Sequence, residues 1–246
     1  MRRSADERHA PAQPLDSGAA PVAFLFDLDG VLVDTRLLVR QLWDAYAAAR
    51  GRTIDDDEFL GRIQGRRTAE ILIDVFGVDP ADARAQAAAG LDDRTAELAA
   101  GAELPEIAGA VAFVRATVGS AIPVALASSA SLPNVTMALQ RLGLTGLFAA
   151  VVTSQDVAHG KPAPDAYLEA ARRIDVEPRR CVVFEDSSAG LDAARAAGAR
   201  TVGVATSETP DDLAELAEIV IPDFVGLDPR SILDRLSGPA WSVARA

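Results

Sequence analysis

Two aspartates two residues apart, Asp27 and Asp29, are the side chains of this sequence best placed to do chemistry. They follow the apolar run 21–26 and precede Gly30, a residue that lets the chain turn sharply as a strand ends. Both carboxylates are then expected at the carboxyl end of a central strand, where open α/β sheets place their ligands. A calcium loop could also contain Asp-x-Asp-Gly, but it needs oxygen ligands where residues 31–33 are valine and leucine. We therefore interpret the pair as catalytic.

Lys161 is the only lysine in the chain, because every other residue in the Lys+Arg total of 24 is an arginine. It lies in the stretch Gly160-Lys161-Pro162-Ala163-Pro164, ahead of a helical segment. A lysine in a chain that otherwise uses arginine indicates a position that needs a compact charge, which a planar guanidinium cannot replace. The alternative is a surface lysine before a proline-initiated helix.

Two other polar groups close short apolar runs. Ser128 and Ser129 end the run 124–127, and the helix that follows could offer backbone N–H groups to an anion. Glu185 and Asp186 end a later run and supply the hard oxygen ligands that Mg²⁺ prefers. Both pairs could instead only cap the helices that follow them.

The composition limits the functions open to the chain. It has 246 residues, a hydrophobic content of 49% and a formal net charge of −12. These values fit a packed α/β protein and argue against nucleic acid or an anionic membrane as a partner. No apolar run reaches the ~18 residues of a membrane span, and a single cysteine cannot form an internal disulfide. We therefore expect a cytoplasmic protein; the sequence does not specify its oligomeric state.

Short apolar runs alternate with amphipathic segments along most of the chain. The runs predict strands at 22–28, 123–127, 149–153, 181–184, 201–205 and 219–221. Helical patterns lie between the later runs, at 133–142, 164–174 and 191–197. This alternation predicts βαβ units and an α/β fold with a doubly wound parallel sheet.

One interval breaks the alternation. Residues 36–104 have a helical pattern with no convincing strand, and glycines interrupt it. We predict an inserted helical cap at 36–104 and an α/β core formed by 21–35 and 105–238. Flexible tails are predicted at 1–20 and 239–246. Since the cap begins next to the paired aspartates, it can close over them.

The four motifs lie near strand ends, in the chain order Asp27 and Asp29, Ser128, Lys161, Glu185 and Asp186. In this order they resemble the signatures of the haloacid dehalogenase superfamily, which has a Rossmann-like core. The resemblance, including the helical cap, covers roughly residues 22–205 and implies phosphoryl transfer. It implies Asp27 as the nucleophile that forms an aspartyl-phosphate, and Asp29 as general acid and then general base. By the same resemblance Ser128 would bind the phosphoryl group, and Lys161 would pair with the nucleophile and the phosphoryl oxygens.

The resemblance also implies a Mg²⁺ cofactor held by the two acidic motifs. The expected ligands are one Asp27 oxygen, the Asp29 backbone carbonyl and Asp186, with Glu185 binding directly or through water. Dehalogenases of the superfamily lack the second aspartate of the first motif, so its presence favours phosphate chemistry.

Five residues are candidates for binding the substrate: Gln64, Gly65, Arg66 and Arg67 of the cap, and Ser129 of the core. Two arginines beside a glycine at a helix start could clamp a second anionic or polyol group. The alternative is a solvated helix start.

Similar cap segments, and a tryptophan placed like Trp43, occur in small sugar- and polyol-phosphate phosphatases of the superfamily. β-Phosphoglucomutases share the architecture, but they generally carry cap lysines and a first-helix histidine, whereas this cap has no lysine and residues 36–40 contain no histidine. We therefore expect a Mg²⁺-dependent phosphomonoesterase acting on a small phosphorylated metabolite, a sugar or polyol phosphate. A β-phosphoglucomutase-like mutase is the alternative, and a non-catalytic binding protein on the same fold is a third interpretation.

Overall fold

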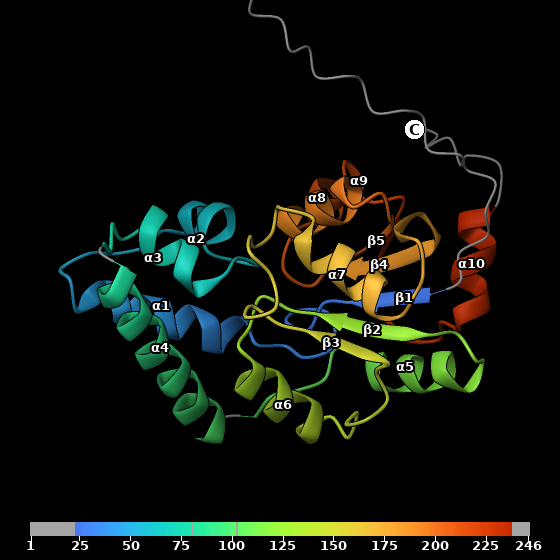
Figure 1. Ribbon diagram of the computed structural model, residues 1–246, viewed down its shortest axis with the longest axis horizontal. Coiled ribbons are helices and arrows are strands. Elements are labelled where there is room, and N and C mark those ends of the chain that lie inside the picture. Colours follow the sequence, from blue (N-terminus) through green and yellow to red (C-terminus); the bar gives the residue numbers. More distant parts are fainter. Residues whose placement is uncertain (1–22, 80, 102, 238–246) are drawn as a thin grey trace, which may run out of the picture.

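The computed structural model describes residues 23–79, 81–101 and 103–237, which form a sheet-based core and a helical part beside it (Figure 1). The core contains a six-stranded sheet in the order β3-β2-β1-β4-β5-β6, and every neighbouring pair is parallel. The strands are β1 (Ala23–Phe26), β2 (Val124–Ala127), β3 (Ala150–Val152), β4 (Cys181–Glu185), β5 (Arg200–Val204) and β6 (Ile219–Ile221). This architecture confirms the predicted doubly wound parallel sheet.

The strand order reverses beside β1. The chain runs from β1 outward to β2 and β3, and then returns to β4 on the other side of β1. In open α/β sheets, ligands bind at such a switch point, outside the carboxyl ends of the strands. The polar residues that follow β1, β2 and β4 are therefore brought to one place.

Helices cover both faces of the sheet (Figure 1). One face packs against α5 (Ala110–Gly119), α6 (Leu132–Arg141) and α10 (Pro229–Ser237). The other packs against α7 (Asp165–Arg173) and α8 (Ser188–Ala196), while α9 (Pro210–Ala214) contacts β5 and β6. A short 3₁₀ helix, η1 (Pro178–Arg180), precedes β4.

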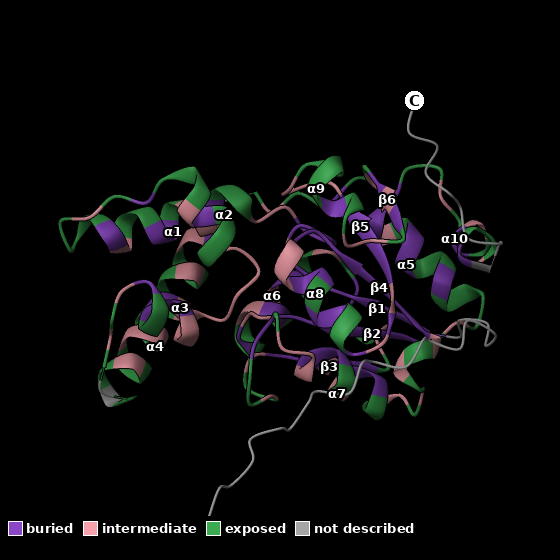
Figure 2. Cartoon of the chain, turned by 90° about the horizontal axis from the view of Figure 1, so that it is seen from above, coloured by how far each residue is buried: buried purple, intermediate pink, exposed green. Residues whose placement is uncertain are grey.

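Because successive residues of a strand face opposite sides, β1 contributes to two different cores. Phe24 and Phe26 belong to the aromatic core, in which the rings of Phe26 and Phe184 stack with centroids 4.8 Å apart. Ala23 and Leu25 belong to the alanine-rich core beneath α7 and α8. The strand is buried on both faces (Figure 2), so the position of its carboxyl end is rigidly set.

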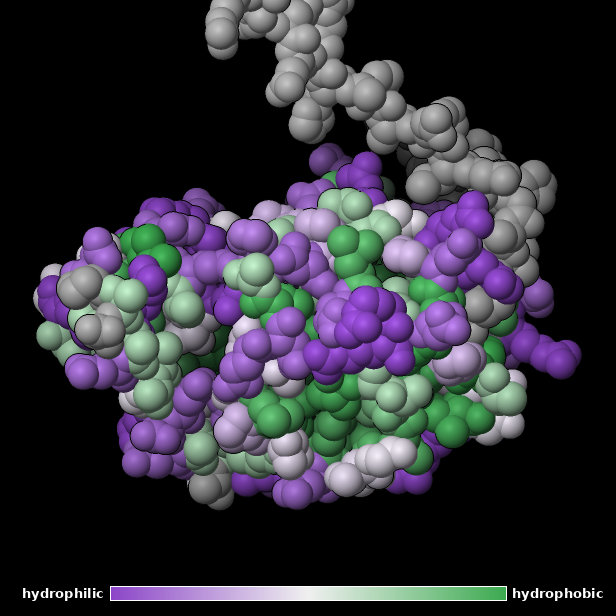
Figure 3. Space-filling model, viewed as in Figure 1, coloured by the Kyte–Doolittle hydropathy of each residue, from purple (hydrophilic) through white to green (hydrophobic). Residues whose placement is uncertain are grey.

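The segment predicted as a cap contains α1 (Arg36–Ala48), α2 (Asp56–Arg62), α3 (Thr68–Asp74) and α4 (Ala81–Gly101), and none of its described residues is in a strand. These helices have a hydrophobic core of their own, in which Trp43 and Phe76 stack with centroids 5.6 Å apart. A recess separates this part from the core in the space-filling view (Figure 3). None of the described helices combines the length and apolarity needed to cross a membrane. The predicted tails, 1–20 and 239–246, lie outside the described residues.

Candidate active site

A buried ion pair between Asp27 and Lys161 forms the centre of the site. Asp27 follows β1 directly, and its backbone N–H donates to the Phe184 carbonyl of β4 over 3.0 Å. Lys161 comes from the loop between β3 and α7, and its Nζ lies 2.7 Å from Asp27 Oδ1. The lysine is 1% exposed, and lysines are almost never buried to this extent unless they are paired.

Glu185, the last residue of β4, holds Lys161 through a second ion pair. Its Oε1 accepts hydrogen bonds from Lys161 Nζ and from the Tyr167 hydroxyl, the latter over 2.5 Å. Its Oε2 accepts from the Asp186 backbone N–H over 3.1 Å and from Ser187 Oγ over 3.2 Å. Both oxygens are thus engaged by protein donors, so the geometry supports a role in positioning Lys161 more directly than the predicted role as a metal ligand.

Tyr167 is a part of the site that the sequence pattern did not reveal. It lies on α7, is fully buried, and directs its hydroxyl to Glu185. Burial and the charge of Glu185 raise the pKa of Tyr167 well above its usual value, so it remains a donor. In the sequence it fits the apolar face of a helix, and the only signal that could have distinguished it is a hydroxyl in that face.

Three carboxylates, those of Asp27, Glu185 and Asp186, bring oxygen atoms within 4.8 Å of one another. The close approach requires Gly30, where an added Cβ would lie 1.8 Å from Asp186 Oδ2 and where φ is +73°. Carboxylate oxygens beside a backbone carbonyl are a donor set that fits Mg²⁺. Asp27 and Asp186, with the Asp29 carbonyl, are the groups that would hold the ion.

Burial raises the pKa of two carboxyl groups in this cluster, those of Asp27 and Asp186. The pKa of Asp27 is raised to about 7 by burial, although Lys161 partly offsets the effect. Burial and the charge of Glu185 raise the pKa of Asp186 well above its usual range. For Lys161, burial alone would lower the pKa, but Asp27 and Glu185 raise it above its ordinary value. The cluster therefore has more carboxylates than its one ammonium can neutralise, and a bound divalent cation would favour the ionised carboxylates.

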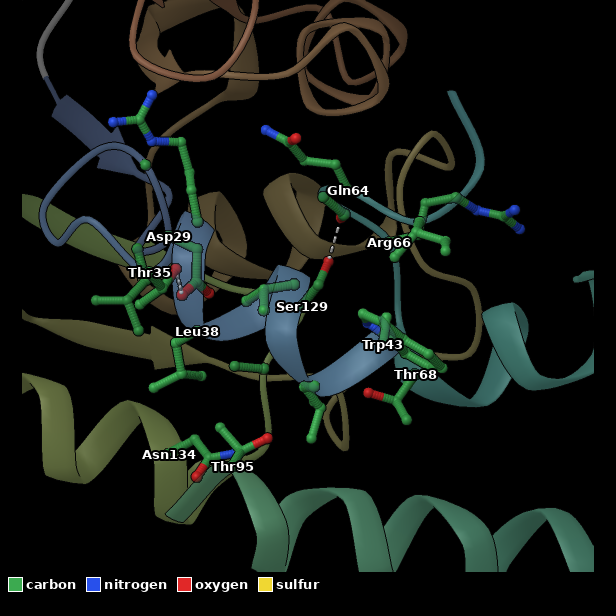
Figure 4. Close-up of a pocket in the computed structure, with 18 of the residues that line it drawn as sticks. Asp29, Thr35, Leu38, Trp43, Gln64, Arg66, Thr68, Thr95, Ser129 and Asn134 are labelled. Atoms are coloured by element: carbon green, nitrogen blue, oxygen red, sulfur yellow. Dashed lines mark hydrogen bonds between the residues drawn. The ribbon is translucent and has the colours of Figure 1, made fainter. Parts of the chain in front are cut away.

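Asp29 lies next to the first cap helix. Its Oδ1 accepts a hydrogen bond from Thr35 Oγ1 over 2.6 Å (Figure 4). Burial raises the pKa of Asp29, while the hydrogen bond from Thr35 lowers it. A carboxyl group with a raised pKa that lines a cavity has the properties needed to donate a proton to a leaving group.

The two serines after β2 have different surroundings. Ser128 is buried, and its Oγ accepts from the Ala130 backbone N–H over 3.0 Å. Because β2 pairs with β1, Ser128 follows a strand adjacent to the one that precedes Asp27. Ser129 Oγ donates to the Gly65 carbonyl of the cap over 2.8 Å (Figure 4). Ser129 therefore lines the cavity and also joins the core to the cap.

A cavity of about 140 Å³ lies between the motif residues and the cap helices. Of the candidate substrate-binding residues, Gln64, Gly65, Arg66 and Ser129 line it. The guanidinium of Arg66 is turned away from the cavity (Figure 4) and donates to Asp74 over 2.5 Å. Arg66 is thus not placed to clamp a second anionic group as predicted, because a carboxylate of the cap already pairs with it.

Arg67 does not line the cavity, and it contacts the loop that carries Lys161. Its Nη1 donates to the Ala158 carbonyl over 2.9 Å, while Glu70 accepts from the Gly160 backbone N–H over 2.7 Å. A Cβ at Gly160 would lie 2.4 Å from Arg67 Cδ, so a larger residue there would displace the Arg67 side chain. In place of the predicted contact with a ligand, Arg67 connects the cap to the core.

Comparison with known proteins identifies the family to which the chain belongs. A family profile described as haloacid dehalogenase-like hydrolase matches residues 22–198. The chain therefore belongs to the haloacid dehalogenase-like hydrolases, as predicted from its motifs.

Two curated relatives are phosphatases. Validoxylamine A 7'-phosphate phosphatase from Streptomyces hygroscopicus subsp. limoneus is 32% identical over 206 residues, 81% of this chain and 92% of the relative. Hexitol phosphatase A from Escherichia coli is 35% identical over 191 residues, 76% of this chain and 85% of the relative. These relatives support the prediction that the chain is an enzyme of the phosphatase type.

A solved structure has the same architecture. CbbY from Rhodobacter sphaeroides, in a substituted form bound to xylulose-(1,5)bisphosphate, matches with a TM-score of 0.74 and 29% identity, over 85% of this chain and 98% of that one. The two proteins therefore share the fold over most of their length.

The Lys161→Arg substitution should reduce turnover of a phosphate ester at least about tenfold, equivalent to ~1.4 kcal/mol of transition-state stabilisation. The space between Asp27 and Glu185 holds a compact ammonium, and a planar guanidinium does not fit the same two contacts. Steady-state phosphate release measures the effect. The matched control is Arg172→Lys on the exposed side of α7, which should leave turnover unchanged. Wild-type turnover by Lys161→Arg would show that the buried ammonium has no special role.

Proposed function

We propose that the protein is a Mg²⁺-dependent phosphomonoesterase that hydrolyses a small phosphorylated sugar or polyol through an aspartyl-phosphate on Asp27. The observation that carries this proposal is the buried Lys161 ammonium, which lies 2.7 Å from Asp27 Oδ1, within a cluster where Asp27 and Asp186 bring carboxylate oxygens together. Phosphoryl transfer needs an in-line nucleophile and positive charge around the transferred group. The phosphatase relatives support the same reaction class.

The reaction would proceed in two displacements at phosphorus. In the first, a carboxylate oxygen of Asp27 forms a bond to phosphorus as the ester P–O bond breaks, and Asp29 gives its proton to the departing alkoxide. In the second, Asp29 takes a proton from a water molecule, whose oxygen attacks phosphorus and releases Asp27 and inorganic phosphate. Asp29 is protonated again at the end, so the cycle is balanced.

The remaining residues would stabilise charge on the phosphoryl oxygens. Lys161 supplies a fixed positive charge, and the Ser128 hydroxyl lies at the end of the adjacent strand. Mg²⁺, when bound by Asp27, Asp186 and the Asp29 carbonyl, would neutralise further negative charge. Glu185 and Tyr167 keep Lys161 directed at the nucleophile.

A mutase of the β-phosphoglucomutase type is the alternative, and it differs in the fate of the aspartyl-phosphate. A phosphatase admits water, whereas a mutase returns the phosphoryl group to a sugar hydroxyl. The cap segment 36–104 contains no lysine and no histidine that could assist such a return. We therefore favour hydrolysis, with free phosphate as the product and no requirement for a bisphosphate activator.

Asp27→Asn should lower phosphate release by at least roughly 10⁴-fold, because an amide is not a nucleophile toward phosphorus and the parts of such a site act as a unit. Thermal unfolding of the variant should remain cooperative, since only one buried charge is removed. Phosphate release from a panel of sugar and polyol phosphates with Mg²⁺ is the measurement, and EDTA should abolish the wild-type rate until Mg²⁺ is restored.

The control for this substitution is Asp192→Asn, an exposed aspartate on α8. It should keep the wild-type rate. Phosphate release by purified Asp27→Asn protein at a rate near that of the control would exclude Asp27 as the nucleophile. Isomerised sugar phosphate appearing faster than free phosphate from the wild type would favour the mutase.

Asp29→Asn should slow turnover of a sugar phosphate by about 10²–10⁴-fold, the usual contribution of a positioned acid or base. The loss in the first step should be smaller for p-nitrophenyl phosphate, whose leaving group needs little protonation. Rapid-quench measurement of the first step, with the sugar phosphate and with p-nitrophenyl phosphate, compares the loss of rate for the two esters. Equal losses would contradict the role of Asp29 as leaving-group acid.

A further inference from the structure

The cavity that would receive the alcohol part of a substrate offers no free positive charge from its lining. Among the described residues that line it, the basic ones are Arg36 and Arg66. Arg36 donates to the two carboxylate oxygens of Asp34 over 2.9 and 2.7 Å. Arg66 donates to Asp74 over 2.5 Å. Each guanidinium thus has a carboxylate partner within the protein, which offsets its charge toward a ligand.

Asp92 adds a negative charge to the same cavity. It lies on α4, and its Oδ1 is 3.4 Å from Nδ2 of Asn134 on α6. Thr95 and Asn134 also line this part of the cavity (Figure 4). A carboxylate accepts hydrogen bonds from the hydroxyl groups of a neutral ligand, and a neighbouring amide and hydroxyl can both donate to them and accept from them. The same carboxylate repels a phosphate group.

Apolar side chains form much of the remaining wall. Leu38, Leu42 and Trp43 come from α1, Phe59 from α2 and Met137 from α6. Binding pockets of this type are mostly apolar, with a few polar groups that set the orientation of the ligand. The wall therefore fits the C–H face of a sugar or polyol and offers no favourable contact to a charged group.

We propose that the substrate is a monophosphate ester with an uncharged alcohol part, hydroxylated on one side and apolar on the other, and that Asp92 excludes compounds with a second phosphate. This inference rests on the proposed function, since it names the substrate class of the same site. CbbY from Rhodobacter sphaeroides has been crystallised with xylulose-(1,5)bisphosphate, so the fold alone does not exclude a second phosphate. In this chain the exclusion comes from the charges of the cavity.

The test uses two ligands that differ only by the second phosphate, fructose 1-phosphate and fructose 1,6-bisphosphate. Each competes with p-nitrophenyl phosphate in the presence of Mg²⁺, and the inhibition constants are compared. We expect the bisphosphate to bind at least about tenfold more weakly than the monophosphate, and Asp92→Asn to reduce that ratio at least about threefold, because like charges repel strongly at a partly buried site. Asp93→Asn, the exposed neighbour on α4, is the matched control and should leave the ratio unchanged.

Three results overturn the inference while leaving phosphatase activity intact: bisphosphate binding as tight as monophosphate binding, no inhibition by the monophosphate, or an unchanged ratio in Asp92→Asn. Failure of the wild type to hydrolyse p-nitrophenyl phosphate or any sugar phosphate contradicts the proposed function instead. In that case, calorimetric titration of the wild type with the same two ligands measures the charge selectivity directly.

Discussion

Burial of several carboxylates around one ammonium is the constraint on which the rest of this structure depends. Asp27, Glu185 and Asp186 converge at the carboxyl ends of β1 and β4, and Lys161 is the one basic side chain that contacts this cluster among the described residues. Buried charges are costly unless they are paired and hydrogen-bonded. The deficit of positive charge would favour binding of a divalent cation. That cation, together with Lys161, would then attract a phosphate group.

The cap contacts the same loops that hold this cluster. Gly65 of the cap lies against Ser187, where an added Cβ would be 2.7 Å from the hydroxyl oxygen. Arg67 and Glu70 contact Ala158 and Gly160 in the loop that also carries Lys161. Gly65 and Arg67 belong to the cap segment 64–67, which the sequence predicted to bind the substrate. The position of Lys161 and the docking of the cap are therefore physically connected, while the proposed selection of the substrate involves other residues of the cavity.

Much of the fold could be predicted from the sequence because its signals are local. Apolar runs predicted all six strands, although β1 ends at Phe26, before the predicted limit of residue 28, because Asp27 and Asp29 leave the sheet. The family was predicted from the same motifs and is confirmed. Their individual roles as nucleophile, acid and metal ligands stay predictions. The fold brings Asp27, Lys161 and Asp186 together, as those roles require.

Other features depend on which partner a side chain finds in the folded chain, so local patterns could not reveal them. The direction of Arg66 is set by Asp74 on the next helix, and that of Arg67 by the carbonyl of Ala158, which is distant in the sequence. Asp92 reaches the cavity because α4 packs beside α6.

The central claim is that Lys161 is a buried ammonium held by carboxylates, and its most direct test uses the fact that Lys161 is the only lysine of the chain. Labelling with ¹⁵N-lysine therefore gives one side-chain signal. We predict a protonated, exchange-protected ammonium that persists above pH 10.5, its ordinary pKa, and whose signal shifts when Mg²⁺ and phosphate are added. A signal that exchanges rapidly and titrates near pH 10.5 would contradict the account.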